Sequence, residues 1–150
     1  MKGYLLDVNV LIALLWTRHE HHAAAQRWFT EASRQGWATC NLTQLAFVRI
    51  VTNPAFSPDA IRASQAVEVL AANLEHPAHQ VWEDRWGVGA LLAPFLSRLI
   101  GHRQVTDAYL LGLAVRQGGH LATFDRGIAS LVSGSELEGR VERIPIEPGA

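Results

Sequence analysis

Short apolar runs alternate with longer helical patterns along most of this chain. The runs that predict strands cover residues 3–6, 37–42, 79–83, 120–124 and 141–146. The patterns that predict helices cover residues 8–16, 23–34, 44–51, about 57–75, 91–100 and 107–117. Strands that alternate with helices are typical of an α/β fold with a mostly parallel central sheet.

Local signals predict where several of these helices begin. Thr43 and Thr106 are expected to cap the helices that follow them, since a threonine hydroxyl can accept a free backbone N–H. Ser57-Pro58-Asp59 has proline where it is favoured, in the first turn of a helix. Gly36 is expected to end the second helix.

The composition fits one domain with a buried core. The chain has 150 residues, of which 49% are hydrophobic and 18% charged, and we expect a single domain over 1–146 with a loose tail over 147–150. Its formal net charge of -1 excludes a general basic field, so any nucleic-acid contact must use a local patch or a metal. One cysteine, no signal peptide and no apolar stretch of membrane-spanning length lead us to expect a cytoplasmic protein.

Three of the five aspartates stand in contexts that suit a metal site. Asp7 and Asp125 each close a short apolar run, and Asp107 opens a helical pattern. Ligands of open parallel sheets bind in the crevice beyond the carboxyl ends of the strands. Carboxylates that meet there would bind a hard cation such as Mg²⁺ or Mn²⁺.

Each aspartate also has an ordinary structural interpretation. Asp107 can be a carboxylate at a helix N-terminus, where the dipole favours negative charge, and Asp7 or Asp125 can be a turn or cap residue. Taken together they favour a metal site. Clustered carboxylates repel one another, and a bound cation would relieve that repulsion, activate a water and stabilise charge on a phosphate.

The chain resembles the PIN-domain ribonucleases, specifically the VapC-type toxins of bacterial toxin–antitoxin pairs. Residues 5–14 resemble the family's opening strand and helix, and residues 47–54 its third helix and exit turn. Residues 102–110 and 121–125 resemble its last two acidic motifs. These matches occur in the family's order and span nearly the whole chain.

The resemblance implies a three-layer α/β/α domain and RNA cleavage that depends on Mg²⁺ or Mn²⁺. It further implies a homodimer and inhibition by a small VapB-like antitoxin. The implied metal ligands are Asp7, Asp107 and Asp125, and the implied catalytic set adds the residue at position 44.

Position 44 departs from the family pattern. The family usually has a glutamate near the start of the third helix, and this chain has Gln44. A glutamine can offer a carbonyl oxygen or hold a water, but it adds no charge, which puts metal affinity and rate in question. Glu83 or Asp84 could compensate, although solvated loop acids explain both.

Three further residues are candidates for positioning the substrate. Asn9 could orient water or phosphate, or could be a helix cap. Thr123 should face the same side of its strand as Asp125 and could steady it. Arg49 could reach a phosphate or lie on a solvated helix face. The run His19–His22 lacks the spacing of a zinc protease motif, so we interpret it as a solvated helix start.

Two other classes of function stay open at this point. Asp7-Val8-Asn9 is similar to the Asp-x-Asp loop of haloacid-dehalogenase-like phosphatases, but the second aspartate is absent, and the only lysine, Lys2, is too early for their phosphate-binding lysine. The other class is a PIN-like module that binds RNA or a partner without cutting. Cleavage of RNA that EDTA abolishes would separate an enzyme from a binding module, and a covalent aspartyl-phosphate would favour the phosphatase.

Overall fold

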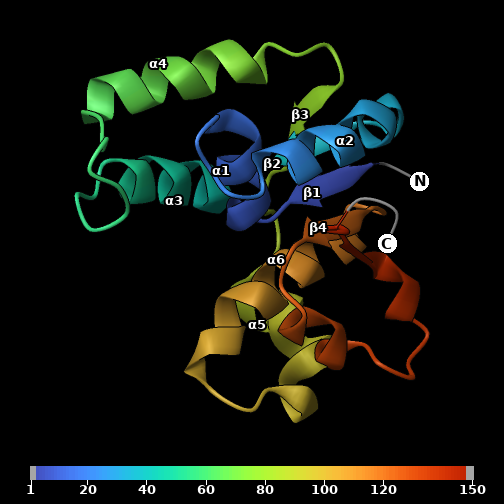
Figure 1. The fold of residues 1–150 in the computed structure, drawn as a ribbon. Helices are drawn as coiled ribbons and strands as arrows, with labels where there is room; N and C mark the ends of the chain where they lie inside the picture. Colours follow the sequence, from blue (N-terminus) through green and yellow to red (C-terminus); the bar gives the residue numbers. More distant parts are fainter. Residues whose placement is uncertain (1–2, 148–150) are drawn as a thin grey trace.

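The computed structural model describes residues 3–147, which form a five-stranded parallel sheet with helices on both faces (Figure 1). The strands are β1 (Tyr4–Leu6), β2 (Trp37–Thr39), β3 (His79–Val81), β4 (His120–Thr123) and β5 (Val141–Arg143). Their order in the sheet is β3-β2-β1-β4-β5, and every pairing is parallel. The predicted three-layer α/β fold is therefore confirmed. Residues 148–150 of the predicted tail lie outside the described residues.

Each face of the sheet has its own apolar core, because successive side chains of a strand point to opposite faces. Tyr4 and Leu6 pack with α1 (Val8–Leu15), α2 (His22–Ala32), α3 (Asn41–Val51) and α4 (Ala63–Leu74). Leu5 packs with α6 (Val105–Arg116) on the other face. The helix α5 (Val88–Leu92) lies against α6 in Figure 1. Short 3-10 helices complete the structure: η1 (Ser33–Gln35), η2 (Ala93–Arg98), η3 (His102–Gln104), η4 (Gly127–Leu131) and η5 (Glu138–Arg140).

The third helix begins at Asn41, so the prediction that Thr43 caps a helix from Gln44 is wrong. Thr43 lies inside the first turn, where its Oγ1 accepts the backbone N–H of Cys40 at 3.0 Å. Threonine satisfies a free N–H in either place, which is why the sequence alone misplaced the start. The early helix also ends β2 at Thr39, three residues before the predicted end.

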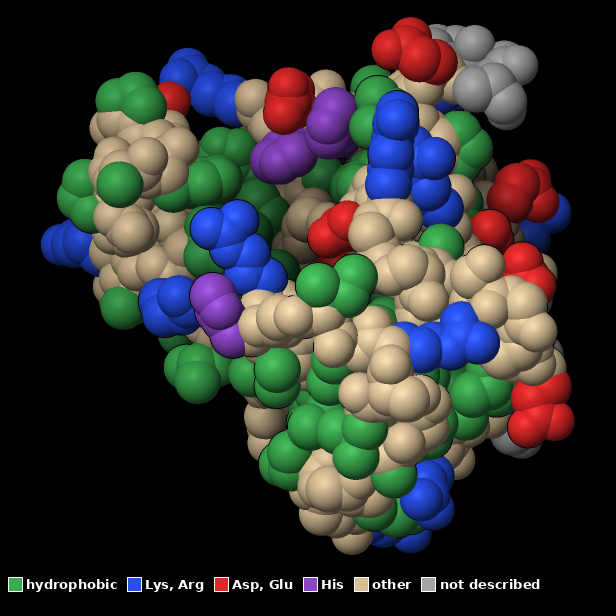
Figure 2. Space-filling view, turned by 90° about the horizontal axis from the view of Figure 1, so that it is seen from below, with side chains coloured by type: hydrophobic (Ala, Val, Ile, Leu, Met, Phe, Trp, Pro, Cys, Tyr) green, Lys and Arg blue, Asp and Glu red, His purple; other side chains and the backbone are tan. Residues whose placement is uncertain are grey.

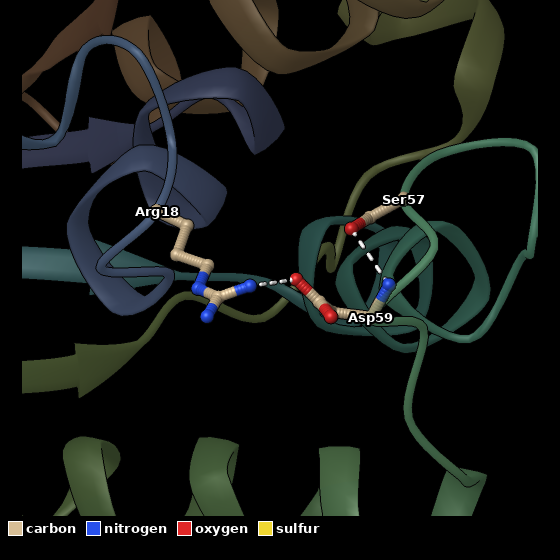
Figure 3. A network of polar contacts seen from close by, with 3 residues as sticks. All are labelled: Arg18, Ser57 and Asp59. Carbon is tan, nitrogen blue, oxygen red and sulfur yellow. Dashed lines mark hydrogen bonds and ion pairs between the residues drawn. The ribbon is translucent and has the colours of Figure 1, made fainter.

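The fourth helix begins at Ala63, not at Ser57-Pro58-Asp59. The N–H of Asp59 donates to Ser57 Oγ at 3.0 Å, and the carboxylate of Asp59 pairs with Arg18 (Figure 3). These contacts hold the segment as a turn. The helix starts after Arg62, whose N–H donates to Gln65 Oε1 at 3.0 Å.

The remaining helix predictions need smaller corrections. The helix α6 starts at Val105, so Thr106 is not its cap and Asp107 lies within its first turn. The pattern over 91–100 is divided between α5 and η2, because Pro94 has no N–H to continue an α-helix. The predicted strands over 79–83, 120–124 and 141–146 each end earlier, at Val81, Thr123 and Arg143.

A glycine allows the close approach of α5 and α6. A Cβ placed on Gly112 would lie 2.1 Å from the carbonyl oxygen of Leu91, so no other residue fits without moving a backbone. This contact sets the position of α6 and, with it, of Asp107.

Among the helices of residues 3–147, none combines the length and apolarity needed to cross a membrane.

Candidate functional site

Asp7 is buried at the end of β1 and is fixed by two hydrogen bonds. It is 6% exposed. The N–H of Val8 donates to its Oδ1 at 2.7 Å, and the hydroxyl of Thr123 donates to its Oδ2 at 2.7 Å. Burial raises the pKa of Asp7, the two hydrogen bonds oppose that rise, and the charge of Asp125 adds to it. Asp7 is therefore both the N-cap of α1 and a carboxylate of the candidate site.

Asp125 follows β4 on the neighbouring strand. Its N–H donates to Thr123 Oγ1 at 3.0 Å, and its Oδ1 accepts the N–H of Gly127 at 2.7 Å. The Thr123 hydroxyl thus joins the carboxylate of Asp7 to the backbone of Asp125. Thr123 therefore lies beside the backbone of Asp125, as the alternation of a strand led us to expect, and its role in positioning the substrate stays a prediction.

Asp107 completes the group from the first turn of α6, on one face of the sheet. Its side chain is half-buried, and its pKa is raised to about 6 by burial first and then by the charges of Asp7 and Asp125. Among residues 3–147, no hydrogen bond or ion pair stabilises its charged form. The three carboxylates are therefore electrostatically coupled, and Asp107 is the one without a donor.

The topology explains why these residues meet. The strands β1 and β4 are parallel neighbours, with Leu6 opposite Ala122, so Asp7 and Asp125 follow their carboxyl ends at one edge of the sheet. The strands β2 and β3 lie on one side of β1, whereas β4 and β5 lie on the other side. This reversal is the switch point at which open α/β sheets bind ligands. Figure 2 shows acidic side chains recessed in a hollow on one face, with basic side chains around it.

The donor chemistry of the three aspartates fits a divalent cation. Hard cations prefer carboxylate oxygens, and Mg²⁺ keeps several waters while it uses only one or two carboxylates directly. A cation here would also offset the mutual repulsion that raises the pKa of Asp107. Within residues 3–147, no group of three or more His, Cys, Asp or Glu side chains is arranged to hold a metal ion directly. The carboxylates would therefore act partly through metal-bound water.

Asn9 lies at the edge of this group. Its Oδ1 is 3.5 Å from the N–H of Phe124, which separates Thr123 from Asp125. The side chain is half-exposed on the first turn of α1. It can therefore reach both solvent and the loop that carries Asp125.

Gln44 is held by other partners than the aspartates. Its Nε2 donates to Thr39 Oγ1 at 2.9 Å, and Thr39 Oγ1 in turn lies 2.8 Å from His79 Nε2. Burial lowers the pKa of His79, which favours a neutral ring in this network. The sequence did not reveal the network, because it depends on a strand pairing between β2 and β3.

Arg49 points away from the core. Arg49 is exposed and stands two positions after the buried Phe47, which is about 200° around an α-helix.

The two acids that could compensate for Gln44 also have other partners. Asp84 accepts the hydroxyl of Tyr109, and Glu83 pairs with Arg85 at 4.0 Å.

The run His19–His22 makes structural contacts. His19 Nδ1 accepts the N–H of His21 at 3.0 Å, and His22 Nδ1 lies 2.7 Å from the carbonyl oxygen of Ala13. The ring of His21 packs against Phe124 with 5.3 Å between centroids. The histidines therefore pack the loop before α2 against the segment that carries Asp125.

Comparisons with known proteins agree with this architecture. The PIN domain family matches residues 4–132. Ribonuclease VapC39 of Mycobacterium tuberculosis is 43% identical over 89% of this chain and 96% of its own length. Ribonuclease VapC38 of the same organism is 46% identical over 85% of this chain and 88% of its own. The chain therefore belongs to the PIN-domain family and, within it, to the VapC-type ribonucleases.

A solved structure shares the fold at low sequence identity. It is described as VapBC2 from Rickettsia felis bound to a DNA fragment from their promoter. The match has a TM-score of 0.63 and 12% identity, and it covers 95% of this chain and 98% of that chain. At this identity the likeness supports the fold alone.

Proposed function

We propose that this protein is a metal-dependent endoribonuclease that acts as the toxin of a bacterial toxin–antitoxin pair. The observation that carries the proposal is the group of three coupled carboxylates, in which Asp107 has a pKa raised to about 6 and no hydrogen-bond donor within residues 3–147. Such a group at the carboxyl edge of a parallel sheet suits a cation and a phosphodiester. The names of the VapC relatives support RNA as the substrate.

Each residue would have a definite role in RNA cleavage. A bound Mg²⁺ or Mn²⁺ would activate a water and stabilise charge on the scissile phosphate. Asp7, Asp107 and Asp125 would hold the cation or its waters. Thr123 would keep Asp7 and the backbone of Asp125 in fixed orientation through its hydroxyl. Asn9 would orient water or phosphate at the edge of the site.

Gln44 would contribute less than the glutamate usual in the family. Its amide nitrogen is bound to Thr39, which leaves the carbonyl oxygen to hold a water. Three formal negative charges would then face the cation where relatives have four. We propose that the site works with a weaker affinity for metal.

The proposed partners are a VapB-like antitoxin and a second copy of this chain. The family resemblance supports both, and the solved neighbour is described as a VapBC protein. A groove of about 410 Å³ offers an apolar surface for a protein; Leu42, Leu45, Val88 and Val105 are among its lining residues. Light scattering would measure whether the chain alone is a dimer, and co-purification with the product of a neighbouring gene would identify the antitoxin.

The central test is metal-dependent cleavage of RNA. The wild-type protein should cut RNA in Mn²⁺ or Mg²⁺, EDTA should abolish the cut, and Asp7→Asn should remove most activity. Expression of the wild type should arrest growth, and the variant should relieve the arrest. Glu68→Gln, an exposed change on α4, serves as the matched control and should cleave like the wild type.

Other outcomes would favour the alternatives. RNA binding without cleavage in any divalent metal would indicate a catalytically inactive binding module. Hydrolysis of phosphate monoesters through a covalent aspartyl-phosphate would indicate a phosphatase. Cleavage that persists in EDTA would contradict the metal-dependent mechanism.

A further inference from the structure

A cavity of about 480 Å³ opens beside the candidate site at the edge strand β5. Of the residues that the structure describes, two arginines, three apolar residues and one glutamate line it: Arg126, Arg143, Ile144, Pro145, Ile146 and Glu147. It lies outside the group of aspartates, and the function proposed above assigns it no role.

Both arginines lie next to the end of β4, the segment that leads to Asp125. Arg126 directly follows Asp125, in the turn that the N–H of Gly127 closes on Asp125 Oδ1. Arg143 is opposite Thr123 in the β4–β5 pairing, and the N–H of the next residue, Ile144, donates to the carbonyl of Thr123 at 2.9 Å. The cavity and the three carboxylates therefore share the carboxyl edge of the sheet.

The two guanidinium groups are available for a ligand. Both side chains are exposed, and neither forms a hydrogen bond or an ion pair within residues 3–147. The lining segment that follows β5 is held in place, because Arg27 Nη2 donates to the carbonyl oxygen of Ile146 at 3.3 Å. Figure 2 shows basic side chains gathered beside the recessed acidic ones.

We propose that Arg126 and Arg143 form a phosphate-binding site for the RNA backbone next to the scissile bond. Guanidinium groups bind phosphate oxygens with two parallel hydrogen bonds. A chain with net charge -1 needs such a local patch to hold RNA. A strand whose scissile phosphate lies at the aspartates would present a neighbouring phosphate at this cavity. This inference rests on the proposed ribonuclease function, since it assumes RNA as the ligand.

Binding of RNA without cleavage tests the site directly. A fluorescent single-stranded RNA oligonucleotide is titrated with the full-length protein in EDTA, at several salt concentrations. Each of Arg126→Ala and Arg143→Ala should lower the slope of log K against log salt by about 0.7, the value for one phosphate contact on single-stranded nucleic acid. The double variant should bind on the order of tenfold more weakly at low salt.

Two further variants make the test specific. Arg34→Ala removes the same charge from η1, which precedes β2 and so lies near the amino ends of the strands. Arg34 pairs with the exposed Glu31 at 3.5 Å, and its loss should leave the salt slope unchanged. Glu147→Gln removes an acidic side chain that lines the cavity and should strengthen RNA binding. Circular dichroism of every variant checks that the fold is retained.

Several results would overturn the proposal. They are an unchanged salt slope in the double variant, an equal loss in Arg34→Ala, or no RNA binding by the wild type in EDTA. Binding of polyglutamate that depends on both arginines, with RNA binding unaffected, would assign the cavity to an acidic protein instead. Cleavage of RNA in Mn²⁺ is measured in a separate assay, which tests the proposed nuclease function and not this site. RNA binding that depends on the arginines without any cleavage would refute the nuclease function and leave this site standing.

Discussion

Replacing Asp107 by asparagine should make the metal-free protein more stable and less active. The pKa of Asp107 rises from its ordinary value of 3.8 to about 6, which corresponds to a penalty of about 3 kcal/mol on the charged form. The side chain is only half-buried, so solvent screening reduces that penalty to about 1–2 kcal/mol. Asparagine keeps the shape of the side chain and removes the charge.

The pH dependence follows from the sign of this shift. Since the pKa of Asp107 is higher in the folded protein than in the unfolded chain, the folded protein binds the proton more tightly. The stability contributed by this group therefore falls as the pH rises from about 4 to about 6, and the full penalty is present at pH 7. Asp107→Asn should raise the free energy of unfolding by about 1–2 kcal/mol at pH 7 and by almost nothing near pH 4.

Thermal unfolding in EDTA measures this difference. A gain of about 1–2 kcal/mol corresponds to about 2–8 °C in Tm for a chain of this size. Added Mn²⁺ should stabilise the wild type more than the variant, because only the wild type retains the third carboxylate. Glu68→Gln should show neither effect. An Asp107→Asn protein that is no more stable at pH 7, or whose gain is the same at pH 4, would refute the electrostatic argument.

Three other changes test separate parts of the structure. Thr123→Val removes the hydroxyl that donates to Asp7, so it should lower the free energy of unfolding by about 1–2 kcal/mol in urea titrations and reduce RNA cleavage; unchanged values for both would contradict this role. Gln44→Glu should lower the Mn²⁺ concentration needed for half-maximal cleavage, since it adds a charge, and an identical metal titration would place Gln44 outside the metal's influence. Gly112→Ala should destabilise the fold by about 2 kcal/mol or more, because its Cβ would meet the Leu91 carbonyl; a variant that unfolds at the wild-type temperature would contradict this packing.

The sequence predicted the parts of the site that depend on strands. Asp7 and Asp125 stand at the ends of two short apolar runs, and parallel strands bring their carboxyl ends to one edge. The two-residue period of a strand also placed Thr123 beside Asp125, and the Thr123 hydroxyl does accept the N–H of Asp125. These inferences needed only the direction of each strand and the alternation of its side chains.

The sequence could not predict contacts that depend on distant partners. The helix α4 begins later than predicted because Asp59 is bound by Arg18, which lies 41 positions earlier in the chain. Gln44 donates to Thr39, whose hydroxyl also contacts His79 on the next strand, 40 positions away from Thr39. A local signal such as a threonine or a proline predicts that a helix begins nearby, but it does not predict which residue is the first of the helix.

The position of β1 at the centre of the sheet has a consequence during protein synthesis. Asp7 and its partner Thr123 are separated by 116 positions, and Thr123 lies on a strand that must pair directly with β1. At about 5–20 residues per second, that strand leaves the ribosome about 6–23 s after Asp7. A nascent chain that stops before β4 cannot assemble the group of aspartates, so a ribosome making this protein is not exposed to the finished site until β4 and Asp125 have emerged.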